Sequence, residues 1–278
     1  MRFRSTFWSL LLLLGSSSYV WAHGPVHELI IEVSTQIKAD PQNARLYLQR
    51  GEYYRLDKDF DASYSDLLFA ERLDSTLALD VAFQMAQLFS EQSFPQSGLL
   101  YINTVLTHNP THVKALITRA GIYKQLGQDS LSVLDFSQAL AYAKEPRPHH
   151  FLEIAQATLR TDSTDFDGAR HWLEQGEEAL GFNIVLRSYA IEIDRQAKAW
   201  DAAIAKIDDI ISRLPRHEKW LLHKAELLEE AGRIASAITH YQATLDAIEK
   251  LPRRMKATRA VSEWQATALV RLQALQNG

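Results

Sequence analysis

The sequence of 278 residues contains no cysteine, and this absence excludes several kinds of chemistry. Without thiols the chain has no disulfide framework, even in an oxidising compartment that would permit one. It has no thiol nucleophile and no soft thiolate ligand for a metal ion. A lipoprotein anchor is excluded as well, because no cysteine follows the apolar stretch near the N-terminus.

Familiar catalytic motifs are also missing. The chain contains no glycine loop that could cradle phosphate, no His-Glu-x-x-His pair and no Gly-x-Ser-x-Gly elbow. The many Asp and Glu residues fall on helix faces that we expect to be solvated, and nothing singles out one acid–base pair. We therefore expect a protein that is not an enzyme, with no catalytic residue and no cofactor.

Residues 1–22 have the features of a cleavable signal peptide. Arg2 and Arg4 provide a positive start, residues 7–14 form a short apolar core, and Val20-Trp21-Ala22 offers a cleavage point. An uncleaved anchor is the alternative, but the apolar core is too short for an ordinary membrane-spanning helix. We expect a mature chain that begins at His23, has no stable membrane anchor and is periplasmic or secreted.

The balance of charge argues against nucleic acid as a partner. The whole chain has a formal net charge of −4, and removal of Arg2 and Arg4 leaves 28 basic residues against 34 acidic ones, a net charge of −6. Nucleic-acid-binding domains are usually basic. The hydrophobic content of 46% suits a soluble globular or repeat protein and not a disordered chain.

Residues 113–146 contain two apolar helical patterns in succession, separated by Gly127. Small residues stand where two helices would have to approach closely, and large aromatic residues stand beside them. The small residues are Ala120, Ser132 and Ala139, and the aromatic ones are Tyr123 and Phe136. This stretch predicts a pair of helices packed face to face.

The same alternation of small and large residues returns along the chain. The residues 34 positions before Ala120 and Phe136 are Ala86 and Ile102. Later in the chain, Ala169, Ala203 and Ala237 are spaced by 34 residues, as are Leu173, Ile207 and Tyr241. Prolines fall where units should close, at Pro41, Pro110, Pro146, Pro215 and Pro252.

This pattern resembles the tetratricopeptide repeat (TPR) family. The resemblance covers nearly all of the mature chain and implies an all-α, right-handed superhelical solenoid of antiparallel helix pairs. The first helix of each pair would line its concave face. We expect an N-terminal capping helix in 23–42, six TPR-like helix pairs in 43–252 and a C-terminal capping helix in 253–278. That division gives about fourteen helices and no strand.

The fourth repeat is irregular, because residues 161–165 lengthen the turn between its helices. A tolerated loop insertion explains this, since surface insertions cost little. A joint that lets the two halves flex is the alternative. The fifth repeat also departs from the family pattern, with Ile191 at a small position and Asp194 at an aromatic one.

Histidine offers the only candidate for metal binding. His23 would provide both its amine and its ring to copper, and His27 follows it at helical spacing. Pro25 interrupts such a chelate, however, and His149 and His150 would point in different directions on a helix. We expect no metal site and regard His23 and His27 as weak candidates.

The residues predicted to face the groove lie beside the buried stripe of each first helix. They are polar, amide-rich and of both charge signs, with Glu52, Glu192 and Glu226 among them. The lysine–asparagine clamp of TPR domains that bind chaperone C-termini is not carried over, because those asparagines are absent. The predicted contacts to a partner are Gln49, Arg55, Phe83, Gln84, Gln87, Lys114, Lys124, Gln156, Arg160, Tyr189, Arg195, Lys219 and His223.

Two functions of different class follow from this reading. The first is a non-enzymatic periplasmic or secreted scaffold that binds a protein or peptide in its groove and supports assembly or adaptor roles. The alternative is a metal- or small-molecule-binding accessory protein that uses the N-terminal histidines or a groove pocket.

Overall fold

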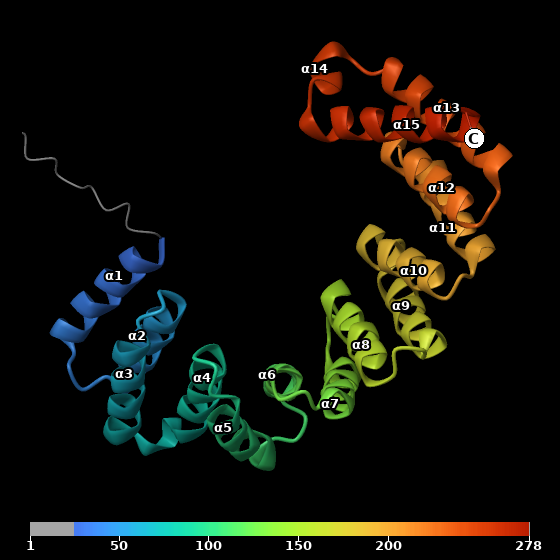
Figure 1. Ribbon diagram of the computed structural model, residues 1–278. Coiled ribbons are helices and arrows are strands. Elements are labelled where there is room, and N and C mark those ends of the chain that lie inside the picture. The colour runs from blue at the N-terminus through green and yellow to red at the C-terminus, as the bar shows by residue number, and fades with distance from the viewer. Residues whose placement is uncertain (1–24, 278) are drawn as a thin grey trace, which may run out of the picture. The chain divides into compact units, whose positions relative to one another are not determined.

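The computed structural model describes residues 25–277, and all regular structure in that range is helical (Figure 1). No strand occurs among these residues, as the sequence predicts. The predicted signal peptide and His23 lie outside the described range. The helices are α1 (Pro25–Ala39), α2 (Ala44–Leu56), α3 (Phe60–Leu73), the 3-10 helix η1 (Ser75–Leu77), α4 (Ala78–Glu91), α5 (Pro95–His108), α6 (Val113–Gln125), α7 (Asp129–Tyr142), α8 (Pro148–Thr161), α9 (Phe166–Leu180), α10 (Ile184–Gln196), α11 (Trp200–Arg213), α12 (Glu218–Glu230), α13 (Ile234–Glu249), α14 (Arg253–Lys256) and α15 (Arg259–Asn277).

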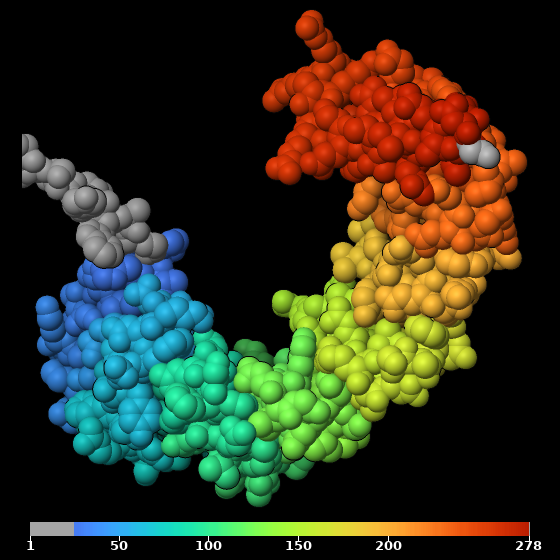
Figure 2. Space-filling view, in the orientation of Figure 1, coloured from blue at the N-terminus to red at the C-terminus, as the bar shows by residue number. Residues whose placement is uncertain are grey.

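The chain divides into two compact units, one up to Gln84 and one from Met85 onward, and α4 contains the boundary. In the first unit α1 packs on α2, and α2 packs on α3. In the second unit each helix from α5 to α13 contacts the next one along the chain, and α15 packs on α13. In the space-filling view the surface from α8 to α13 is unbroken (Figure 2). The prediction of an all-helical solenoid of consecutive helix pairs is confirmed.

Small residues hold the two helices of a pair close together. The Ser63 hydroxyl donates to the backbone carbonyl of Gly51 at 2.7 Å, and this contact joins α3 to α2. Ser132 in α7 donates in the same way to the carbonyl of Ala120 in α6 at 2.9 Å. All four residues are buried. A larger side chain at these positions would separate the helices, which explains the small residues in the sequence pattern.

The turn inside five of the six pairs uses one residue in the left-handed backbone conformation. Gly127 and Gly232 adopt it with φ of 68° and 74°. Glycine adopts this conformation without the steric cost of a Cβ atom. Lys58, Ser93 and Lys198 hold the same place in three other turns, with φ between 55° and 66°. The turn geometry is therefore set by the helix pair and does not require glycine.

The fourth pair has a longer turn that is ordered by side-chain hydrogen bonds. The backbone N–H and the hydroxyl of Thr164 donate to Asp162 Oδ1 at 2.9 and 2.7 Å. The hydroxyl bond and then the backbone bond lower the pKa of Asp162. Asp74 and Thr76 repeat this arrangement after α3, at 2.9 and 2.6 Å. The boundary between the two compact units lies at Gln84 and Met85 and not at this turn.

Ionic contacts at equivalent positions tie three successive helices together. Arg50 in α2 binds Asp66 of α3 in two-point contact, at 2.6 and 2.8 Å, and also donates to Ser34 of α1 at 3.1 Å. Each of its partners is 16 residues away in sequence. The same contacts recur in α6, α7 and α5 at Arg119, Asp135 and Asn103.

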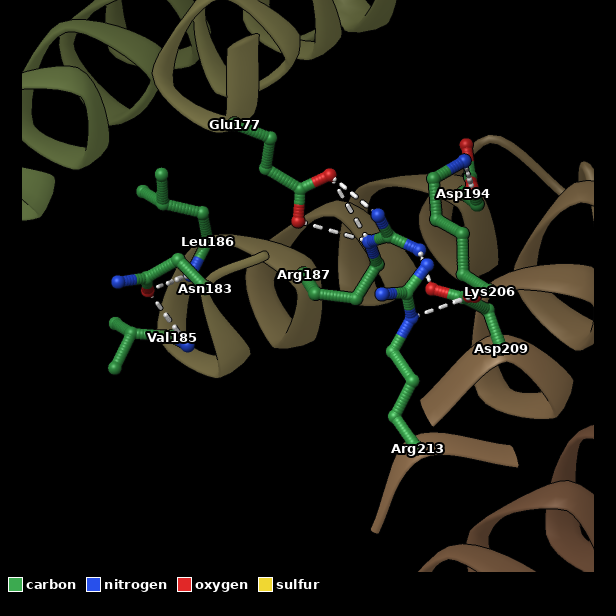
Figure 3. Close-up of polar contacts among 9 residues, drawn as sticks. All are labelled: Glu177, Asn183, Val185, Leu186, Arg187, Asp194, Lys206, Asp209 and Arg213. Carbon is green, nitrogen blue, oxygen red and sulfur yellow. Dashed lines mark hydrogen bonds and ion pairs between the residues drawn. The ribbon is translucent and has the colours of Figure 1, made fainter. Parts of the chain in front are cut away.

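A denser ionic cluster joins α9, α10 and α11 (Figure 3). Arg187 donates to Glu177 at 2.6 to 3.0 Å and to Asp209 at 2.7 Å, and Arg213 also binds Asp209 at 2.8 Å. Bonding to Glu177 raises the pKa of Arg187 above its ordinary value. The cluster fixes three helices relative to one another through charge-assisted hydrogen bonds.

Asp194 explains why the fifth repeat departs from the family pattern. Its carboxylate is fully buried, and it accepts from Arg170 Nε at 2.7 Å and from Lys206 Nζ at 2.6 Å. Lys206 is drawn beside it in Figure 3. A buried carboxylate needs such partners, because its desolvation is costly. The aromatic residue expected at this place is therefore replaced by an ion triad.

The C-terminal segment differs from the single capping helix that the sequence predicts. Residues 253–278 contain two helices, the short α14 and the longer α15, with Ala257 exposed between them. The Thr258 carbonyl accepts from the N–H of Ser262 and so opens the first turn of α15. Val261, Ala268 and Leu272 of α15 are buried, and with this break the described residues contain fifteen α-helices, in line with the prediction of about fourteen.

Candidate binding face of the first helices

The first helices of consecutive pairs in the second unit present side chains that contact one another. Gln125 of α6 donates to the hydroxyl of Ser90 in α4 at 2.9 Å. Lys124 of α6 binds Glu153 of α8 at 2.7 Å. Arg195 of α10 binds Glu230 of α12 in two-point contact, with both distances at 2.8 Å. These pairs, together with the packing of α8 against α10, place the accessible side chains of α4, α6, α8, α10 and α12 on one surface, which we call the first-helix face.

Most predicted contact residues are accessible on the first helices. Gln49, Lys114, Lys124, Arg160 and Lys219 are exposed. Partly exposed are Phe83, Gln87, Gln156, Tyr189, Arg195 and His223. Burial raises the pKa of Tyr189, so its hydroxyl stays protonated and able to donate at neutral pH.

Arg55 and Gln84 differ from this expectation, because both are buried. Arg55 follows Ala44 and Gly51 on one stripe of α2 that packs inward. Gln84 lies in α4, where Val81, Ala82, Met85, Ala86 and Leu88 are all buried. Because neighbouring residues cover most of α4, Gln84 does not reach solvent, although it lies beside the apolar stripe of the helix. Neither residue is available for a partner in this conformation.

Three cations of the face are already paired with carboxylates of the same chain. Lys124 binds Glu153, and Arg160 binds Asp129 of α7 at 2.7 Å. Arg195 binds Glu230, and this bonding raises its pKa. At Lys124, Arg160 and Arg195 a partner would therefore meet ion pairs and not isolated positive charges.

The tryptophans fall on the inner side of the helices. Trp220 is buried, with the Lys219 ammonium 5.3 Å from its ring centroid. Trp172 is partly exposed and packs beside the cluster that contains Ala120, Phe136 and Ile154.

A pocket of about 460 Å³ opens where α10, α12, α13 and α15 meet. This volume falls within the range typical of small-ligand sites, about 300–1,000 Å³. Its polar lining comes from all four helices. The residues are Arg195 from α10, His223, Glu226, Glu229 and Glu230 from α12, Tyr241 from α13, and Thr267 and Arg271 from α15.

One wall of the pocket is a closed network. The hydroxyl of the fully buried Tyr241 donates to Glu229 Oε2 at 2.7 Å. Arg271 binds the same carboxylate through Nε, at 3.1 Å, and through Nη2. Burial and the bond to Glu229 raise the pKa of Tyr241, and Glu229 raises the pKa of Arg271.

The sequence predicted part of this pocket and missed the rest. Arg195, His223 and Glu226 were expected on the groove side of the first helices. Tyr241 and Arg271 were not, because they come from a second helix and from the C-terminal helix. Only the packing of α15 against α12 and α13 brings them to the site, and no spacing in the sequence signals it.

Metal-binding geometry is absent from the described residues, which contain no group of three His, Asp or Glu side chains suited to a metal ion. His27 lies in the first turn of α1 and is partly exposed. His150 is buried at the start of α8, and burial, with His149 and Arg147 nearby, lowers its pKa to about 4. Nothing in residues 25–277 therefore supports the histidine hypothesis.

Over residues 25–277, no helix has the length and apolar character needed to cross a membrane.

Comparison with known proteins shows the fold but not the function. No family model matches the chain, and no curated protein matches it. The C-terminal part of a TPR repeat-containing protein from Cytophaga hutchinsonii aligns with a TM-score of 0.66 at 11% identity, covering 86% of this chain and 94% of that one. PilW, described as a widely conserved type IV pilus biogenesis factor, aligns with a TM-score of 0.56 at 17% identity, covering 68% and 86%. A TPR protein from Parabacteroides merdae gives 0.52 at 15% identity, covering 88% and 93%.

Proposed function

The fold is that of TPR proteins, and we propose that this chain is a non-enzymatic scaffold that binds a protein or peptide partner on its first-helix face. The observation that supports this best is the row of paired but accessible polar side chains across α6, α8, α10 and α12. Repeat proteins use such surfaces for extended partners. Amides can pair with the main chain of a peptide, and arginine can hold carboxylates in two-point contact.

We further propose that the protein acts in the periplasm or outside the cell, in an assembly or adaptor role. The N-terminal sequence supports export. The fold likeness to PilW, a pilus biogenesis factor, is compatible with an assembly role. The described residues offer no metal cluster, so the metal-binding alternative gains no support from them.

Site-specific photo-crosslinking tests the first-helix face. A photoreactive residue at Gln87 or Gln156 should capture the partner in cells. The same residue at Leu100 or Leu134, which are exposed on the second helices α5 and α7, should capture little. Capture from the second helices alone would place the partner elsewhere and overturn the assignment.

Charge changes give a second test of the same face. The double change Lys124→Glu and Arg160→Glu should weaken partner capture, and more so at low salt, because screening is then weaker. The matched control is Arg72→Glu with Lys250→Glu, two exposed cations on the second helix α3 and at the end of the second helix α13. Equal loss in both double variants would indicate a non-specific effect of charge.

Export has its own prediction. When the full chain is produced in a bacterium with a general secretion pathway, the mature protein should begin at His23. Mass spectrometry of the purified protein measures this directly. A chain that keeps residues 1–22 and fractionates with membranes would show that the segment is an uncleaved anchor.

A further inference from the structure

The pocket between α10, α12, α13 and α15 has one acidic group that the chain leaves without a partner. Arg195 is bound to Glu230, and Arg271 is bound to Glu229. The Tyr241 hydroxyl is used in its bond to Glu229. Among the described residues the Glu226 carboxylate makes no hydrogen bond and no ion pair, although it lines the same pocket and is partly buried.

The surroundings of Glu226 favour a positive group in the pocket. Burial is the main cause of its raised pKa, and repulsion from Glu230 adds to it more strongly than Arg195 can relieve it. His223 also faces the pocket, and burial lowers its pKa, so the imidazole is neutral at pH 7 and can accept a hydrogen bond. An incoming cation would pair with the carboxylate and would have a second acceptor beside it.

The size and the donor set of the pocket limit what that cation can be. A volume of about 460 Å³ holds a lysine or arginine side chain with some water. The described residues provide no group of three side chains fit for a metal ion, so an organic cation suits the site better. An anion would meet an unpaired carboxylate, because both arginines are already occupied.

We propose that this pocket binds the ammonium or guanidinium group of a lysine or arginine side chain on the partner, with Glu226 as the anion that pairs with it. The proposal rests on the proposed function, because the cation belongs to the partner's chain. Arg195 and Arg271 neutralise Glu230 and Glu229, which also line the pocket, so Glu226 is the carboxylate left to pair with the ligand.

Small blocked amino acids test the pocket without knowledge of the partner. N-acetyl-lysine methylamide and N-acetyl-arginine methylamide are titrated into the isotope-labelled mature chain, and binding is followed by NMR. The neutral analogues contain norleucine and citrulline. The cationic probes should bind at least about tenfold more tightly than the neutral ones, because a charged hydrogen bond contributes about 1.5–3 kcal/mol.

A matched pair of variants identifies the carboxylate. Glu226→Gln should weaken binding of the cationic probes by about tenfold or more. Glu174→Gln removes an exposed carboxylate on α9, outside the pocket, and should leave binding unchanged. Equal affinity for cationic and neutral probes, or an unaffected Glu226→Gln variant that keeps its fold by circular dichroism, would overturn the proposal.

The pH dependence gives a further readout. Binding should weaken as the pH falls, because Glu226 takes up a proton at its raised pKa and His223 becomes positive at lower pH. The Glu226 part of this dependence should be absent in Glu226→Gln. The other charged or titratable groups around the pocket are Glu192, Arg195, Lys219, Glu229, Glu230, Tyr241 and Arg271.

The two proposals fail in different ways. If crosslinking from Gln87 and Gln156 captures the partner but the cationic probes do not bind, the pocket assignment is wrong and the scaffold function stands. If the probes bind in a Glu226-dependent way but the partner is captured only from the second helices, the pocket is real and the proposed partner face is wrong.

Discussion

At the residue scale, Glu226 shows how a partly buried carboxylate without a partner can lower stability. Its raised pKa means that the folded state disfavours the charged form. The folded state therefore binds a proton more readily than the unfolded state, and the carboxylate lowers stability as the pH rises through its unfolded and then its folded pKa. A carboxylate that stabilises the fold behaves in the opposite way, because its removal lowers the free energy of unfolding.

We predict that Glu226→Gln raises the melting temperature of the free protein above neutral pH and has a smaller effect in acid. Thermal unfolding followed by circular dichroism at several pH values measures this. Glu174→Gln is the control and should change the melting temperature little at any pH, since Glu174 is exposed. A lower melting temperature for Glu226→Gln would mean that the carboxylate stabilises the fold.

Gly176 and Gly121 form a matched pair for the packing of the core. A Cβ atom at Gly176 would lie 2.6 Å from Leu186 Cδ1 and 2.9 Å from Phe151 Cγ. At Gly121, in the middle of α6, it would meet nothing within 4 Å. Gly176→Ala should lower the free energy of unfolding by about 1–3 kcal/mol. Gly121→Ala should raise it by about 0.5–1 kcal/mol.

Urea unfolding of both variants beside the parent protein checks this prediction. If Gly176→Ala is as stable as the parent, then α9 does not pack against α8 and α10 as described. Gly121→Ala shows whether the method resolves the small gain from better helix propensity.

The sequence predicted burial correctly for residues whose helix follows the repeat pattern regularly. Ala120, Ser132 and Ala139 are all buried, as the size pattern implies. Arg55 was misjudged, since its charge suggested solvent while its position on the stripe of α2 puts it inside. Amphipathic spacing predicts a direction from the helix axis, and not whether a neighbour covers it.

At the element scale, ion pairs inside the repeats differ strongly in burial. The Asp135 side chain is 2% exposed, and its partner Arg119 is 22% exposed. In α15, by contrast, Arg259 and Glu263 are 92% and 59% exposed. Removing one partner of a buried pair leaves an uncompensated charge, whereas a surface pair is already solvated.

We predict that Asp135→Asn lowers the free energy of unfolding by about 3 kcal/mol, the low end for a broken buried pair, because Arg119 keeps some access to solvent. Glu263→Gln should change it by about 0–1 kcal/mol. Denaturant unfolding at 0.1 and 1 M salt separates the two cases, since only the surface pair is strongly screened. Equal effects would mean that the Asp135 pair is open to water.

Element boundaries could be predicted where a breaker residue marks them. Gly127 ends the pattern of α6, and Pro95 begins α5. The break between α14 and α15 was missed, because Ala257 continues the apolar spacing across it. Local hydrogen bonds at Thr258 decide that break, and apolar periodicity does not report them.

At the scale of the whole molecule, the C-terminal helix closes the apolar end of the solenoid. Ala268 and Leu272 of α15 belong to the same buried cluster as Leu222 and Tyr241. A solenoid needs such a cap, because its last apolar face would otherwise meet water. The cap also supplies Arg271 to the pocket, so closure and binding depend on the same helix.

We predict that Ala268→Gln with Leu272→Gln lowers the free energy of unfolding by at least about 2 kcal/mol and promotes aggregation. The matched control is Leu269→Gln with Val270→Gln on the solvent side of α15, where these residues are 42% and 63% exposed. This control should change stability by no more than about 0.5 kcal/mol. Light scattering and urea unfolding measure both effects, and a tolerant Ala268/Leu272 variant would show that α15 is dispensable.

The overall fold was predictable from the sequence because the same pattern of small and large residues recurs in successive repeats. A step of about 34 residues occurs often enough to outweigh irregular units, such as the fourth. The pocket was only partly predictable, because it forms once, where the repeats end and α15 begins. A site that is not repeated leaves no periodic signal in the sequence.

The ionic contacts of Arg50 and Arg119 have a consequence for how the chain folds. In the pair between them Met85 holds the equivalent position, and in the fourth pair Ile154 does; both are buried and apolar. Units with the same helix-pair architecture could dock out of register by one repeat during folding. Such a slip would separate Arg50 from Ser34 of α1, or Arg119 from Asn103 of α5, and a lost hydrogen bond to a charged group costs about 1.5–3 kcal/mol. The contacts of these two arginines with the preceding helix thus favour the correct neighbour and oppose misassembly of similar units.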